Sequence, residues 1–87
     1  MIYRRNPAVV FQVIEDRVML LDPRRAELIT LTPSGSEVWR VLERPGGPQD
    51  VVERLHDEYP DANREIMLSD VAIFLGQLKA AGALQEI

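Results

Sequence analysis

Few side chains in this sequence have the types and spacing that catalysis or metal binding requires. There is one histidine, His56, and no cysteine, whereas a zinc site needs three or four clustered His, Cys or carboxylate ligands. Ser34, Ser36 and Ser69 are interpreted as helix caps or surface positions, because none has an evident paired base. The Gly46-Gly47 pair is too short for a phosphate-binding loop and lacks its lysine. We therefore predict no enzymatic activity, no metal site and no cofactor.

The length and charge of the chain narrow the range of partners. Its 87 residues, 46% of them hydrophobic, predict a single globular domain spanning 1–87. The net charge is −4, and it is uneven: residues 1–44 carry seven Arg against six acids, whereas residues 45–87 carry three Lys or Arg against eight acids. Because a net negative charge repels phosphate backbones, we expect no nucleic-acid partner.

The hydropathy pattern also bears on location. No apolar run approaches the roughly 20 residues of a membrane-spanning helix, so no membrane partner is expected. The basic N-terminal residues lead into a strand pattern rather than into the apolar region of a signal peptide. The absence of cysteine fits a reducing compartment. We expect a cytoplasmic protein.

Three β-branched, apolar segments near the N-terminus predict strands. Residues 9–14 and 17–21 flank the polar pair Glu15-Asp16, which is typical of a hairpin. The Asp22-Pro23-Arg24-Arg25 break has turn residues and precedes the segment 27–31. Consecutive strands with short turns form an antiparallel meander. The strand at 27–31 is therefore expected to lie at an edge of the sheet.

Helical patterns occupy the rest of the chain. Two capping registers are possible for the first helix: Thr32 before Pro33, or Ser34 with Glu37. The helix is expected to stop before the segment 44–47. A second helix begins near Pro48, buries Val51, Val52, Leu55 and Tyr59, and ends at Pro60, while a third runs from about 64 to 81 and closes at Gly82. The fold class is therefore α+β: a three-stranded antiparallel β-meander followed by three α-helices, winged helix-turn-helix-like.

The third helix has more apolar surface than one buried stripe needs. Seven apolar residues already span about 140° of its circumference. They are Met67, Leu68, Val71, Phe74, Leu75, Leu78 and Ala81. Ile66 and Ile73 lie outside this arc. An open sheet edge beside such a helix could bind an extended peptide, because the edge offers unpaired backbone groups and the helix offers pockets.

Several segments together give the chain a family resemblance that covers nearly its whole length. They are Val18-Met19-Leu20-Leu21-Asp22, Leu28-Ile29-Thr30-Leu31-Thr32, the helix Ser34 to Leu42 with Trp39, and Asp70-Val71-Ala72-Ile73-Phe74-Leu75-Gly76-Gln77-Leu78 ending in Ala81-Gly82-Ala83-Leu84. In order and spacing they resemble the PqqD-like family, the recognition domains that act on ribosomally synthesised, post-translationally modified peptides. The sequence is most similar to the free-standing recognition proteins of lasso-peptide pathways.

The resemblance implies a function and a site. In that family the precursor's leader peptide adds as an antiparallel strand to the third strand and packs into the groove against the third helix. Carried onto this sequence, the peptide-binding residues are Glu27, Leu28, Ile29, Thr30, Leu31, Met67, Asp70, Val71, Phe74 and Leu78. The implied partners are the precursor peptide, a leader peptidase and an ATP-dependent cyclase, and the implied leader carries a Tyr-x-x-Pro element. A proline at Ile29 or an alanine at Phe74 is expected to abolish binding.

Other interpretations of the same residues remain. Val71, Leu75 and Leu78 also suit an ordinary hydrophobic core, and Asp70 suits a solvated surface. The chain could serve another modified-peptide pathway, or dimerise through its open edge. A winged-helix DNA-binding regulator is the runner-up, but the predicted third helix carries only Arg64 and Lys79 as cations, too few for a DNA-reading helix.

Overall fold

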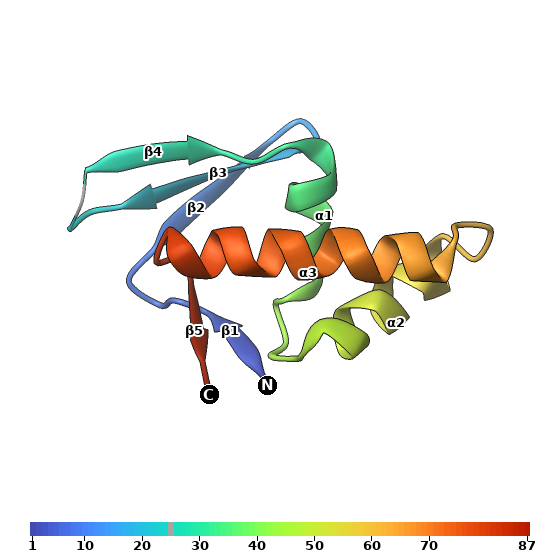
Figure 1. The fold of residues 1–87 in the computed structure, drawn as a ribbon. Coiled ribbons are helices and arrows are strands. Elements are labelled where there is room, and N and C mark those ends of the chain that lie inside the picture. The colour runs from blue at the N-terminus through green and yellow to red at the C-terminus, as the bar shows by residue number, and fades with distance from the viewer. Residues whose placement is uncertain (25) are drawn as a thin grey trace.

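The computed structural model describes residues 1–24 and 26–87, and it contains the predicted meander and three helices (Figure 1). Strands β2 (Val10–Ile14), β3 (Arg17–Asp22) and β4 (Glu27–Thr30) form one antiparallel sheet in the order β2-β3-β4. Strand β4 pairs with β3, which leaves its other side as a sheet edge. Arg25, the last residue of the predicted turn, lies outside the described residues. The α+β fold class is confirmed.

The three helices follow the predicted order, and their caps settle the open register. Helix α1 spans Pro33–Val41 and is capped by Thr32, whose Oγ1 accepts a hydrogen bond from the Gly35 amide at 3.1 Å. Thr32 rather than Ser34 is therefore the cap. Helix α2 spans Pro48–Glu58 and helix α3 spans Arg64–Ala80. In Figure 1, α3 crosses the molecule as its longest element, with the sheet on one side and α2 on the other.

A hydrophobic core joins the sheet to all three helices. Its largest fully buried side chains come from β3 and from every helix: Trp39, Leu20, Leu42, Leu75, Val51 and Val52. The core interpretation of Trp39 is therefore confirmed. The Phe11 ring meets Trp39 edge-on, with 5.5 Å between ring centroids, and the Arg5 guanidinium lies over both rings. Burial lowers the pKa of Arg5, which also donates hydrogen bonds to the Trp39 carbonyl.

Ser36 joins helix α1 to strand β3, a role that its interpretation as a cap or surface residue missed. Its side chain is buried, and its Oγ accepts a hydrogen bond from the Val18 amide at 2.9 Å. The Val18 carbonyl accepts from the Leu31 amide at 2.8 Å. The hydroxyl thus completes the β3 ladder where β4 turns into α1, and it satisfies an amide whose burial without a partner costs about 1–3 kcal/mol.

A second, two-stranded sheet was not predicted. Strand β1 (Tyr3–Arg5) pairs antiparallel with β5 (Leu84–Glu86), so both chain ends lie together below α3 in Figure 1. Strand β1 is too short to show a periodic pattern. Buried Asn6 reinforces the junction, because its backbone amide donates to the Ala83 carbonyl at 2.8 Å and its Nδ2 donates to the Gly82 carbonyl at 2.9 Å.

Gly82 ends helix α3 as predicted, and its backbone gives a testable consequence. Gly82 has φ 79°, its amide donates to the Lys79 carbonyl, and the Ala83 amide donates to the Leu78 carbonyl. This is the Schellman arrangement, which requires a left-handed residue. We expect Gly82→Ala to lower the free energy of unfolding by about 1–2 kcal/mol, measured by urea denaturation.

Gly76 supplies the matched control for that measurement. It lies inside α3, and a Cβ added there meets no heavy atom within 4 Å. Gly76→Ala is therefore expected to raise the free energy of unfolding by up to about 1 kcal/mol, through helix propensity. Equal changes in the two variants would contradict the left-handed requirement at Gly82.

Candidate functional site

Within the described part of the chain, the outer edge of β4 presents unpaired backbone groups at alternate residues. Because the Leu31 amide bonds the Val18 carbonyl, the hydrogen-bonded pairs across β3 and β4 include Leu20 with Ile29. The intervening residues, Leu28 and Thr30, therefore point their N–H and C=O groups away from β3. An extended chain can pair with these groups and lengthen the sheet by one strand.

Because of this alternation, proline at Ile29, the substitution expected from the sequence to abolish binding, would not test the β4 edge alone. Ile29 directs its N–H toward β3, so proline there would remove a bond of the ladder that holds the sheet together. Loss of binding in Ile29→Pro would then report unfolding as much as loss of the edge. Thr30 directs its N–H outward, where proline is tolerated in edge strands. Thr30 is therefore the residue at which the edge can be tested.

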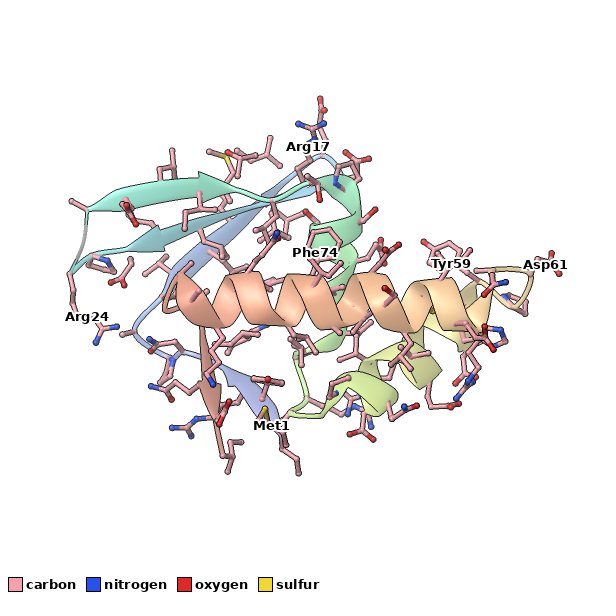
Figure 2. The ribbon with its side chains drawn as sticks, in the orientation of Figure 1. Met1, Arg17, Arg24, Tyr59, Asp61 and Phe74 are labelled. Atoms are coloured by element: carbon pink, nitrogen blue, oxygen red, sulfur yellow. The ribbon has the colours of Figure 1, made fainter. Side chains whose placement is uncertain are left out.

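Phe74 stands at the place where α3 approaches the start of α1. Figure 2 shows its ring pointing from the middle of α3 toward α1. Gly35 of α1 makes this close approach possible, since a Cβ on Gly35 would lie 3.1 Å from Phe74 Cε1. The ring is half-buried and packs against the margin of the core. One face of Phe74 is therefore held by the protein, while the remainder is accessible to a ligand.

A groove of about 640 Å³ extends from Phe74 along the N-terminal half of α3. Its walls come from the β2–β3 turn, the first turns of α1, the end of α2 and α3. The lining residues are Asp16, Pro33, Ser34, Glu37, Val38, Leu55, Tyr59, Ala62, Asn63, Ile66, Met67, Asp70, Val71 and Phe74. Its size and largely apolar walls suit a few peptide side chains.

The predicted α3 residues fall into two groups in the structure. Met67, Asp70, Val71 and Phe74 all line the groove. Val71 is almost wholly buried and so contributes to the floor, whereas Asp70 is exposed at the rim. Leu78 is buried in the core and does not line this groove.

The predicted strand residues form the β4 edge rather than the wall of the groove. Glu27, Leu28 and Thr30 are exposed, Ile29 is half-buried, and Leu31 lies one residue beyond β4 with its side chain in the core. The strand continues directly into the Pro33–Ser34 wall of the groove. The edge and the groove are therefore consecutive along the chain.

Two large, exposed apolar residues of the groove were not among the predicted site residues. Tyr59, assigned to the buried stripe of the second helix, instead follows the end of α2 and is 51% exposed. Ile66 is 62% exposed on α3. In Figure 2, Tyr59 lies near the N-terminal end of α3, far along the helix from Phe74. The surplus of apolar surface outside the α3 stripe was the one sequence signal for Ile66.

Charges on α3 argue against reading of DNA by this helix. Its two cations are both engaged with carboxylates: Arg64 forms an ion pair with Glu53, and Lys79 with Glu86. Helix α2 has net charge −3. A DNA-reading helix needs free cations for phosphates and base edges, so the winged-helix regulator finds no support in these elements.

The described residues hold neither a cluster of metal ligands nor a membrane-spanning helix. Across residues 1–24 and 26–87, no group of three His, Cys, Asp or Glu side chains could hold a metal ion. In the same part of the chain, no helix is long and apolar enough to cross a bilayer.

The sequence and the fold of this chain are similar to those of known proteins. The family model described as coenzyme PQQ synthesis protein D (PqqD) matches residues 17–84. Among curated proteins, none matches the chain. A solved structure titled "TbiB1 in Complex with the TbiA(beta) Leader Peptide" is 28% identical, with a TM-score of 0.84, covering 97% of this chain and 96% of that one. Another, "Lasso peptide synthetase B1 complexed with the leader peptide", is 27% identical, with a TM-score of 0.76 and coverages of 97% and 98%.

Proposed function

The chain belongs to the PqqD family, and from this premise we propose that it binds the leader region of a ribosomally made precursor peptide. The observation that carries the proposal is the likeness over nearly the full chain to two proteins solved with leader peptides. The open β4 edge and the adjoining groove supply a physical basis for such binding in this chain. The whole of residues 1–87 acts as one recognition domain.

In the proposed complex the leader adds to β4 as an antiparallel strand. Its backbone pairs with the outward N–H and C=O groups of Leu28 and Thr30. Each of these hydrogen bonds makes a net contribution of about 0.5–1.5 kcal/mol to the free energy of binding. These bonds make no demand on leader sequence, because every non-proline residue offers the same backbone groups. The edge therefore provides affinity and register, and the choice of peptide depends on side-chain pockets.

The groove beside α3 selects the leader by its apolar side chains. Alternate residues of an extended peptide point to the same side, so successive anchors can enter the groove near Phe74 and farther along near Met67. Burying one such anchor contributes about 1.5–3 kcal/mol before the cost of ordering the peptide. The aromatic residue of a Tyr-x-x-Pro element, the element that the family resemblance implies, suits the position beside the Phe74 ring.

The domain acts without catalysis, by presenting the leader to processing enzymes. We propose a leader peptidase and a cyclase of a lasso-peptide-type pathway as these partners, meeting the complex in the cytoplasm, where ribosomal precursors are made. Holding the precursor on a shared scaffold raises its local concentration at the enzyme. A PqqD-like role in another modified-peptide pathway would use the same edge and groove with a different precursor.

Fluorescence polarisation with a labelled leader tests the proposal. The probe is the leader region encoded by a short reading frame beside the gene for this chain, and a scrambled peptide of the same composition is the control. We expect saturable binding of the native leader alone. Equal polarisation changes with the two peptides would contradict the proposal. A peptidase gene and a cyclase gene beside that frame would support the lasso-type pathway.

A further inference from the structure

The groove combines an apolar floor with an acidic rim. Asp16 belongs to the β2–β3 turn, Glu37 to α1 and Asp70 to α3, so carboxylates approach the groove from both walls. Among the described residues that line it, none is Lys, Arg or His. The groove is therefore an anionic site for whatever peptide enters it.

Neighbouring cations neutralise only part of this charge. Arg40 forms ion pairs with both Glu37 and Glu58, and Glu58 does not line the groove. The single positive charge of Arg40 is therefore divided between the two carboxylates. Asp16 and Asp70 form no ion pair with any residue of 1–24 or 26–87. The N-terminus of α1 also faces the groove at Pro33 and Ser34, but a helix terminus carries only about half an elementary charge. The rim stays net negative.

We propose that the leader segment seated between α1 and α3 carries Lys or Arg directly beside its apolar anchor, and that Asp16 and Asp70 select this basic residue. The inference rests on the proposed leader binding and names the class of leader that the groove takes. In an extended peptide, an anchor that points to the floor leaves its two neighbours pointing to the opposite, solvent-facing side, from which the long side chain of Lys or Arg can reach the carboxylates of the rim. A cation at such a neighbour lies beside the acids, whereas a carboxylate there is repelled.

Three fluorescein-labelled peptides test this selection. They share one sequence with a Tyr-x-x-Pro element and differ at the positions flanking the tyrosine, which are Lys, Gln or Glu. We expect the Lys peptide to bind about tenfold more tightly than the Glu peptide at low salt, since exposed charge pairs are individually weak. The preference is expected to shrink between about 0.05 M and about 0.5 M NaCl as screening shortens the range of the charges.

Two protein variants test whether the rim carboxylates cause the preference for the Lys peptide. Asp16→Asn combined with Asp70→Asn is expected to bring the ratio of the Lys and Glu dissociation constants close to one. Asp57→Asn is the control, because Asp57 is exposed on α2 outside the groove, and this variant should keep the ratio.

The outcomes separate the inference from the function on which it rests. If all three peptides bind equally, or if Asp57→Asn removes the preference as fully as the double variant, selection by the rim is overturned and leader binding stands. If none of the peptides binds and the native leader also fails to bind, the proposed function fails, and the inference fails with it.

Discussion

Replacing Thr30 with proline is expected to weaken leader binding by about 30-fold or more while the domain stays folded. The substitution removes an outward N–H and places a ring where the peptide carbonyl would approach, which leaves that carbonyl without a partner. The β3–β4 ladder is preserved, because the Ile29 and Leu31 amides that bond β3 are untouched. Titration by fluorescence polarisation gives the dissociation constant, and circular dichroism confirms the fold.

Two controls separate the edge from other effects of the substitution. Thr30→Val keeps the N–H and the β-branched shape, so it is expected to bind within about twofold of the original protein. Val13→Pro removes an outward N–H from β2, the opposite edge of the same sheet. It is expected to leave leader binding intact. Strong binding by folded Thr30→Pro, or equal losses at the two edges, would exclude strand addition to β4.

Phe74→Ala is expected to weaken binding by about 10- to 100-fold, because it removes the aromatic wall at the α1 end of the groove. The side chain is half-buried and packs against the core margin, so some loss of stability accompanies it. A domain with about 5–15 kcal/mol of stability tolerates this change. Affinity is measured by calorimetry at a temperature where thermal denaturation shows the variant to be folded.

Ile73→Ala is the matched control for Phe74→Ala. Ile73 is the preceding residue of α3, is 57% exposed and does not line the groove. Its truncation removes a similar amount of apolar surface from the helix without touching the groove. We expect unchanged affinity. Comparable losses in the two variants would mean that the peptide contacts another face of α3.

Much of the architecture was predictable from local pattern. The two-residue break at Glu15-Asp16 between β-branched runs predicted the β2–β3 hairpin, and the break after 22 predicted β4 as an edge strand. Pro48 and Gly82 marked helix ends that the structure confirms. These signals act within a few residues of chain, where backbone sterics and capping decide the conformation.

Features that depend on distant contacts were not predictable in the same way. Strand β1 exists because β5 pairs with it, and three residues alone show no periodicity. Ser36 looked like a surface or cap residue until its hydroxyl was placed against the Val18 amide. Tyr59 continued the apolar spacing of the second helix, but the chain leaves the helix before it and turns the ring toward solvent.

The candidate site was likewise predictable from the sequence only in part. By itself, the sequence determined an edge strand at 27–31, one residue longer than β4, and an α3 with excess apolar surface, since strand and helix patterns are properties of the local chain. The tertiary structure decided which β4 amides face outward, because that depends on the register with β3. It also gathered Asp16, Glu37 and Asp70, far apart in sequence, around one groove. Residues on separate elements share a site only when packing brings those elements together.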